Sequence, residues 1–279
     1  LRCLPQALLG WRRVRGAGVN PDHALHALLD LLKALGYRFV TPSPATHARV
    51  LADRTERVAR DLRDVFGWSL PFHPAVMPDE IVQLLRAGSA LIEEDDLLAS
   101  TVRVSTLGDD YFLHSAYPTT QQDAVFLGPD SYRFSNFLRA HLPRLAPRAH
   151  VVDVGTGAGV GAIAAARCMP EAYVTLTDIN RGALRLAAIN WMAGAFPFGG
   201  VMFKQGDGLS NVGDPQRPID CIIANPPYIA DPARRAYRDG GAMHGAGANG
   251  NLPTEPRARL HTDMLQCDGE QTRGHLFAG

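Results

Sequence analysis

The stretch that decides the fold is VVDVGTGAGVGAIAAA, residues 151–166. It begins as an apolar run typical of a strand buried on both faces, turns through closely spaced glycines and continues as an Ala-rich helical segment. Glycines let the backbone turn sharply and approach a bound molecule, and the first turn of a helix offers N–H groups without intrahelical partners. The stretch therefore predicts a ligand-binding loop at one edge of a parallel sheet.

The sequence on both sides of this loop alternates between helices and strands. We expect these elements over residues 131–141, 161–169, 173–177, 181–191, 201–203 and 219–224. Short apolar strands that alternate with helices are typical of a doubly wound α/β fold, and we predict a Rossmann-like sheet.

Two kinds of ligand fit the glycine loop. Residues 157–162 match the G-x-G-x-x-A pattern of dinucleotide-binding folds, and Asp178 lies about twenty residues further on, where an acid holds a ribose. Asp153 distinguishes the two ligands, because an acid before the first glycine would repel a pyrophosphate. It is suited instead to anchoring the loop and the cationic amino-acid end of S-adenosylmethionine. Asp178 could also cap the helix that follows it.

A second motif, IIANPPY at residues 222–228, ends the last predicted strand. Ligands of open α/β sheets bind beyond the carboxyl ends of the strands, so this motif should face the glycine loop. The side-chain oxygen of Asn225 and the carbonyl of Pro226 can accept hydrogen bonds from a substrate NH2, and Tyr228 can stack on a flat group. Pro226 and Pro227 fix the backbone. The motif indicates transfer to a planar nitrogen.

Residues 121–249 resemble the small-domain class I S-adenosylmethionine-dependent methyltransferases, which include the bacterial release-factor glutamine methyltransferases. The resemblance implies S-adenosyl-L-methionine as the cofactor and Asn225, Pro226, Pro227 and Tyr228 as the catalytic motif. It implies a cofactor site that comprises Asp153, Gly155, Gly157, Gly159, Asp178, Asp207, Phe126, Pro129 and Tyr132. Within this set Asp178 would hold the ribose and Asp207 would face the adenine. An element that contains Phe126, Pro129 and Tyr132 would close over the cofactor.

The amino-terminal part has a different pattern. Residues 1–20 read as a flexible segment, and residues 21–118 as a mainly helical domain with a β-hairpin, which we expect to contribute to substrate docking. The methyltransferase domain then covers residues 119–279. In the amino-terminal domain we predict helices over residues 21–36, 44–66 and 78–88, and a hairpin formed by residues 101–107 and 111–117.

The carboxyl end departs from the family pattern, which continues through a helix and three further strands. Here residues 257–266 are predicted as the helix and residues 274–277 as the start of a fifth strand. We therefore expect a sheet that is truncated at the carboxyl end, with residues 219–223 at or near its edge.

The composition says less about the identity of the methyl acceptor than the motifs do. Lys+Arg and Asp+Glu are equal at 28 each, so net charge gives no argument for nucleic acid, and we favour a glutamine amide of a protein. Alternatives are an exocyclic amine of rRNA or DNA (adenine N6 or guanine N2), or an inactive cofactor-binding module. The four cysteines are far apart and predict no metal site. No apolar run is long enough for a membrane span, and we expect a cytoplasmic protein.

Overall fold

The computed structural model describes residues 20–197, 200–212, 217–225 and 275–278, the last segment by its backbone. The predicted flexible segment before Asn20, the motif residues Pro226, Pro227 and Tyr228, and the helix predicted over residues 257–266 lie outside the described residues. The chain divides into two compact units, Leu1–Thr119 with Met192–Gly194, and Thr120–Trp191 with Ala195–Gly279.

The amino-terminal unit is built on helices α2 (Pro21–Ala34) and α5 (Asp79–Ala87), which pack against each other. The side-chain oxygen of Asn20 caps α2 by accepting a hydrogen bond from the backbone N of Asp22 at 2.9 Å. An N-cap acceptor satisfies an N–H that has no partner within the helix. The buried face of α2 consists of leucines at helical spacing, as the sequence predicts: Leu25, Leu28, Leu29 and Leu32.

The single helix predicted over residues 44–66 is wrong, because the structure forms α3 (Pro44–Ala52) and α4 (Leu62–Phe66) with a break between them. The buried carboxylate of Asp64 explains the break. It accepts a hydrogen bond from the Arg54 guanidinium at 2.7 Å. Ten helical residues span about 15 Å, so one continuous helix would hold these two side chains apart.

Two antiparallel hairpins follow α5, and they consist of β1 (Leu91–Glu94), β2 (Leu97–Ser100), β3 (Val102–Leu107) and β4 (Asp110–Ser115). The β3–β4 hairpin is the predicted one, and it turns at Gly108 with φ of 60°. The β1–β2 hairpin is not predicted. It turns at Asp95, whose φ of 50° belongs to the left-handed region that aspartate enters more readily than most residues.

The second unit contains the α/β sheet, whose strands are β5 (His150–Val154), β6 (Tyr173–Asp178), β7 (Val201–Gln205), β8 (Cys221–Ala224) and β9 (His275–Ala278). Their order is β7-β6-β5-β8-β9, and the first four are parallel. Val154 of β5 pairs with Thr177 on one side and with Ala224 on the other. The chain therefore leaves β5, β6 and β8 at the same edge, as the predicted Rossmann-like sheet requires.

Helices α6 (Pro129–His141), α7 (Val160–Cys168) and α8 (Arg181–Ala193) belong to the same part of the fold, with the short η3 (Leu142–Arg144) after α6. Helix α6 packs on α7, and α7 contacts β5 and β6. In the described ranges, no helix combines the length and the hydropathy that crossing a membrane would need.

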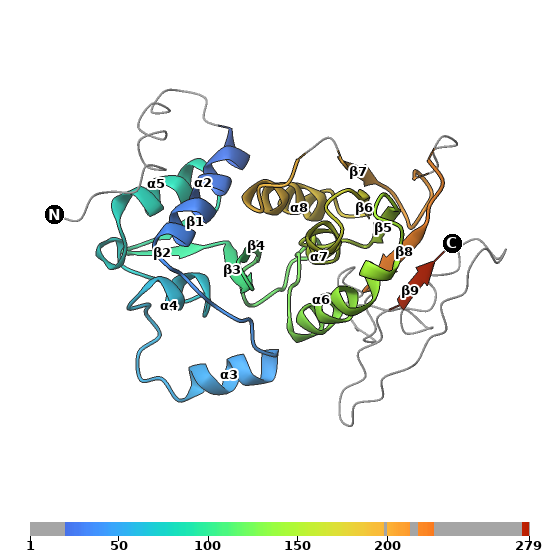
Figure 1. Cartoon of the computed structure of the whole chain (residues 1–279). Helices are drawn as coiled ribbons and strands as arrows, with labels where there is room; N and C mark the ends of the chain where they lie inside the picture. The colour runs from blue at the N-terminus through green and yellow to red at the C-terminus, as the bar shows by residue number, and fades with distance from the viewer. Residues whose placement is uncertain (1–19, 198–199, 213–216, 226–274, 279) are drawn as a thin grey trace. The chain divides into compact units, whose positions relative to one another are not determined.

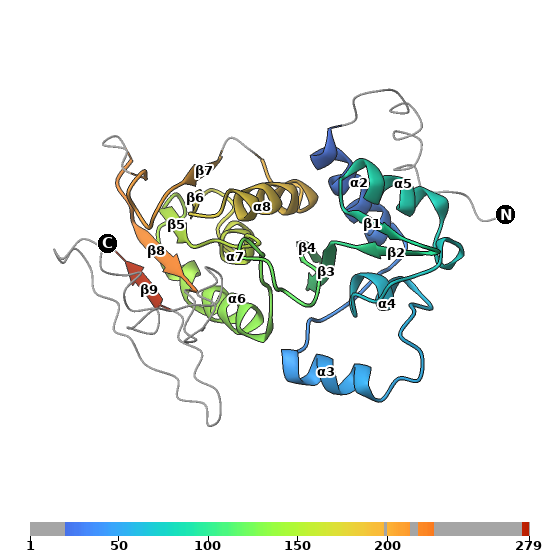
Figure 2. The same cartoon turned by 180° about the vertical axis from the view of Figure 1, so that it is seen from behind.

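Two expectations about this side of the sheet are confirmed: a strand, β9, forms where residues 274–277 were predicted to start one, and β8 lies near the edge, next to the outermost described strand. Strand β9 pairs with β8 along its whole length, from Cys221 opposite Ala278 to Ala224 opposite His275, and the two strands lie side by side in Figure 1 and Figure 2. The pairing is antiparallel, so β9 does not extend the parallel order of the other strands. It supplies the ladder hydrogen bonds that an edge strand lacks.

Candidate active site

The glycine loop joins β5 to α7 in backbone conformations that favour glycine. Gly155, Gly157 and Gly159 have φ of 65°, 54° and 83°. The loop is tied to the next strand, because the N–H groups of Gly155 and Thr156 both donate to the carbonyl of Thr177, at 2.9 and 3.1 Å. A Cβ placed on Gly155 would meet no atom within 4 Å, so this face of the loop is open to a ligand.

Asp153 anchors the glycine loop to the start of α7. Its side chain is 2% exposed, and its Oδ2 accepts hydrogen bonds from the Thr156 hydroxyl at 2.6 Å and from the Ala162 N at 2.9 Å. The N-cap residue Gly159 has no side chain, so Asp153 satisfies a first-turn N–H in its place. Burial raises the pKa of Asp153 to about 7, although both hydrogen bonds oppose the shift.

Gly161 is a site residue that the sequence analysis did not single out. A Cβ at this position would lie 2.8 Å from Oδ1 and 2.9 Å from Oδ2 of Asp153, and 2.9 Å from Cε1 of Phe134. Gly161 is therefore needed for the close approach of α7 to the carboxylate. The signal in the sequence was a further glycine inside a helix, where glycine is unfavourable unless something must pack against it.

Asp178 connects the end of β6 to the same loop. Its Oδ2 accepts from the Gly157 N at 2.9 Å, and its Oδ1 accepts from the Asn180 N at 2.8 Å. The helix-capping alternative belongs to Asn180 instead, whose side-chain oxygen accepts from the Gly182 N at 2.8 Å at the start of α8. Burial raises the pKa of Asp178. Carboxylate oxygens can accept more than one hydrogen bond each, which leaves capacity for ribose hydroxyls.

We expect Asp178→Ala to weaken S-adenosylmethionine binding about tenfold or more, because it removes a multiply bonded carboxylate and releases the loop N–H of Gly157. Isothermal titration measures the effect. Glu171→Ala is the matched control, since Glu171 is an exposed acid just before β6. Equal affinities for both variants and the unchanged protein would contradict the cofactor role of Asp178.

The remaining predicted cofactor residues lie near this edge. Asp207 is exposed and follows β7, whose last residue, Gln205, pairs with Asp178. The carbonyl oxygen of Phe126 lies 4.0 Å from where a Cβ of Gly157 would be, so the segment before α6 passes close to the loop. Pro129 occupies the first turn of α6, and Tyr132 is half-buried on the same helix. The cofactor contacts of all four stay predictions.

Asn225 follows β8 directly, beside the position at which Gly155 follows β5. Its Nδ2 donates a hydrogen bond to Oδ2 of Asp130 at 3.0 Å, while its Oδ1 is buried and has no hydrogen-bond partner among the described residues. A buried acceptor without a partner costs free energy, which indicates that a donor group belongs there. Asp130 was not among the predicted site residues. Its acidic character in the first turn of α6 was the available signal.

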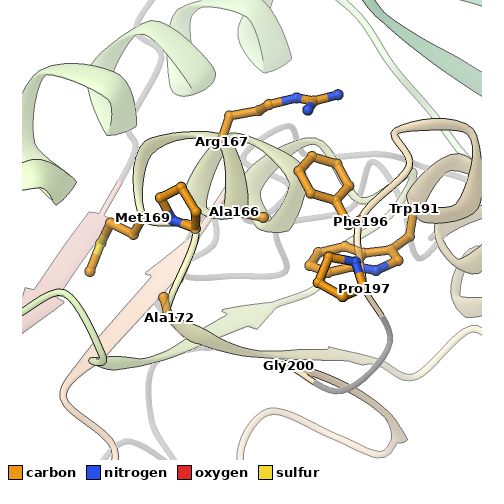
Figure 3. A pocket seen from close by; sticks show the side chains of 9 residues that line it. Ala166, Arg167, Met169, Ala172, Trp191, Phe196, Pro197 and Gly200 are labelled. Carbon is orange, nitrogen blue, oxygen red and sulfur yellow. The ribbon is translucent and has the colours of Figure 1, made fainter.

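A pocket of about 180 Å³ lies at the opposite end of the strands from the glycine loop (Figure 3). Trp191, Phe196 and Arg167 contribute to its wall, and the Arg167 guanidinium lies over the Phe196 ring at 4.2 Å from its centroid. Ala172 and Gly200, which precede β6 and β7, also contribute. The pocket is therefore at the amino ends of these strands, away from the glycine loop and Asn225.

The Trp191 side chain in this pocket provides a stability prediction. The ring is 2% exposed, but its Nε1 has no hydrogen-bond partner among the described residues. We expect Trp191→Phe to change the free energy of unfolding by less than about 1 kcal/mol, whereas Trp191→Ala costs about 3–5 kcal/mol through the cavity that it leaves. Urea denaturation compares them. Equal losses in the two variants would show that the indole N–H stabilises the fold.

The order of the parallel strands, the glycine loop after β5, the acid after β6 and the asparagine after β8 together define a class I S-adenosylmethionine-dependent methyltransferase domain. Comparison with known proteins agrees with this assignment. Residues 119–238 match the family model "Methyltransferase small domain".

Relatives and solved structures are similar over parts of the chain. A protein of Pseudomonas putida named Ribosomal RNA large subunit methyltransferase G is 41% identical over 90 residues, which are 32% of this chain and 23% of that protein. A protein of Streptomyces avermitilis with the same name is 33% identical over 142 residues, 46% of this chain and 36% of that one. The chain thus spans about a third or less of these relatives. A T. thermophilus 16S rRNA N2 methyltransferase in complex with AdoMet and guanosine is 15% identical, with a TM-score of 0.37 over 71% of this chain and 57% of that one.

These relatives correct one prediction. A protein glutamine was the expected acceptor because the whole chain carries no net charge. The relatives are named as ribosomal RNA methyltransferases, which points to nucleic acid instead. Net charge summed over a chain does not describe the local field at a binding face, and a neutral protein can still carry one basic surface.

Proposed function

We propose that this chain takes part in S-adenosylmethionine-dependent methylation of an exocyclic base amine in ribosomal RNA. The observation that supports this most is the buried Oδ1 of Asn225, which lacks a hydrogen-bond partner among the described residues and lies at the edge that holds the glycine loop. An NH2 group on a flat ring is the kind of donor that this acceptor suits.

The chemistry of such an amine explains why an acceptor is needed. The nitrogen lone pair of adenine N6 or guanine N2 is delocalised into the ring, and it must localise toward the methyl group before it can attack. A hydrogen bond from the amine to Oδ1 of Asn225 holds the nitrogen in line and stabilises the positive charge that develops on it.

The cofactor half of the proposal depends on the residues at the ends of β5 and β6. S-adenosylmethionine supplies a methyl group activated by a sulfonium. The Asp178 carboxylate would hold the ribose hydroxyls. The open face beside Gly155 would let the cofactor come close to the backbone of the loop. Asp153 keeps the loop in place through Thr156 and Ala162. In its ionised form the Asp153 carboxylate also favours a cation above the loop.

Ribosomal RNA is proposed as the substrate because of the names of the relatives. An exocyclic amine is proposed as the methyl acceptor because of the geometry of Asn225. A test therefore examines both. The chain, alone and extended to the length of its relatives, is incubated with labelled S-adenosylmethionine and deproteinised ribosomal RNA. Nuclease digestion and chromatography then identify the labelled nucleoside.

We expect label in N6-methyladenosine or N2-methylguanosine, and none in a DNA control. Label on a ring carbon or on a ribose would overturn the amine assignment. Label that appears only in DNA would overturn the RNA assignment. Cofactor binding without transfer to any nucleic acid, in both the short and the extended chain, would indicate the inactive binding module.

A further inference from the structure

Asp130 and Asn225 meet although they are 95 positions apart in the sequence. Asp130 lies in the first turn of α6, and Asn225 follows β8. The nearby backbone N–H groups of Asp130 and Ser131 and the positive charge of Arg133 favour the ionised form of this carboxylate. These groups and Asn225 are the partners that the described residues provide. The contact links helix α6 to the predicted acceptor residue.

The chemistry of this pair decides which way the Asn225 amide points. An ionised carboxylate can only accept hydrogen bonds, so it selects the NH2 end of the amide. The oxygen end must then point away from Asp130, and Oδ1 is the atom that is buried without a partner among the described residues. If a neutral group stood at position 130, either end of the amide could face it, because the two ends of an amide have nearly the same shape.

We propose that Asp130 is a positioning residue that holds the Asn225 amide with its oxygen toward the methyl acceptor. The inference rests on the proposed function, since it assigns the orientation of the group that binds the amine. Asp130 does not touch the substrate in this account. It acts through Asn225, and it removes the alternative orientation in which an NH2 group would oppose the amine of the base.

A pH dependence follows from this role. Burial raises the pKa of Asp130, and the hydrogen bond from Asn225 and the charge of Arg133 oppose the shift. When Asp130 takes up a proton it becomes a donor, and it can then bind the oxygen end of the amide. Turnover should therefore decrease as the pH falls through this raised pKa, while a variant without a titratable group at 130 should lose this dependence.

Exchanging the two side chains tests the pairing directly. Asn225→Asp places two carboxylates against each other, and we expect turnover to fall about a hundredfold. Asp130→Asn leaves the amide orientation free, and we expect a loss of about tenfold in kcat with little change in KM for the cofactor. The double variant Asn225→Asp with Asp130→Asn restores one amide and one carboxylate, with the carboxylate now facing the amine. It should recover at least about tenfold over Asn225→Asp alone.

Asp79→Asn is the matched control, because Asp79 is an exposed acid in the first turn of α5. It should change neither turnover nor its pH profile. A double variant no better than Asn225→Asp alone, or an Asp130→Asn variant with unchanged kcat and pH profile, would overturn the positioning role. The rescue separates this role from a structural one, since a general loss of stability would add in the double variant.

Thermal unfolding at pH 8 gives a reading that does not depend on the substrate. Asn225→Asp should lower Tm by about 3 °C, and the double variant Asn225→Asp with Asp130→Asn should restore the Tm of the unchanged protein. If the unchanged protein methylates no RNA, the proposed function fails, and the unfolding result still tests the Asp130–Asn225 pairing on which the inference depends. Restoration of Tm would support the oriented pair, and its absence would overturn it.

Discussion

Asn225→Ala is expected to lower turnover about a hundredfold or more and to leave the affinity for S-adenosylmethionine nearly unchanged. The side-chain oxygen acts on the substrate nitrogen as charge develops, so its loss raises the barrier and not the cofactor dissociation constant. Single-turnover kinetics with labelled cofactor measures the rate, and isothermal titration measures the affinity. The two readings separate the acceptor role from a role in the cofactor site.

Asn136→Ala provides the control for this prediction, because Asn136 is an exposed asparagine on α6 in the same unit. Its turnover should match that of the unchanged protein. If Asn225→Ala retained full turnover, the assignment of its oxygen to the amine would be wrong. If it lost cofactor affinity in parallel with rate, Asn225 would belong to the cofactor site.

The second large effect concerns Asp153 and the dependence of stability on pH. In the unfolded chain this carboxyl loses its proton near its ordinary pKa of 3.8, while in the folded protein burial raises the pKa to about 7. Between these two values the folded state binds more protons, so the free energy of unfolding falls as the pH rises. The stabilisation that comes from the protonated Asp153 is fully present below pH 3.8 and is lost as the pH rises past about 7. The difference between the folded and unfolded pKa values corresponds to about 4 kcal/mol.

Asp153→Asn isolates this contribution, since an amide oxygen can still accept from Thr156 and Ala162 but does not titrate in this range. As the pH rises from about 4 to about 8, we expect the free energy of unfolding of the variant to increase relative to that of the unchanged protein. Urea denaturation across that range measures it, and other titrating groups cancel in the difference. A difference that stays constant with pH would contradict the raised pKa of Asp153.

The α/β sheet could be predicted from the sequence because its central strands, β5 and β6, are largely buried. Residues 151–154 and 219–224 are apolar runs that end in a glycine loop and in the asparagine motif. Local patterns of this kind carry enough information to place the loop, Asp178 and Asn225 at one edge.

Contacts between distant residues could not be predicted in this way. Nothing in the local pattern shows that Arg54 folds back to Asp64, or that Asp130 meets Asn225, because each contact depends on where separate elements lie in space. The antiparallel direction of β9 is a further example, since a short strand has the same pattern in both directions. The acceptor was predicted wrongly for a related reason, because composition averages over faces that the fold separates.

The pairing of β9 with β8 also affects the order in which the sheet can assemble. Strands β5 and β6 are joined through α7, whereas Ala224 and His275 pair across about fifty intervening residues, and the entropy of closing a loop grows with its length. The β5–β6 pair should therefore form before the β8–β9 pair. In pulsed hydrogen exchange during refolding, the amides that hold the glycine loop would gain protection early, and those beside Asn225 would gain it late. A newly made chain would then pass through a species with the cofactor loop already formed and the acceptor side still incomplete.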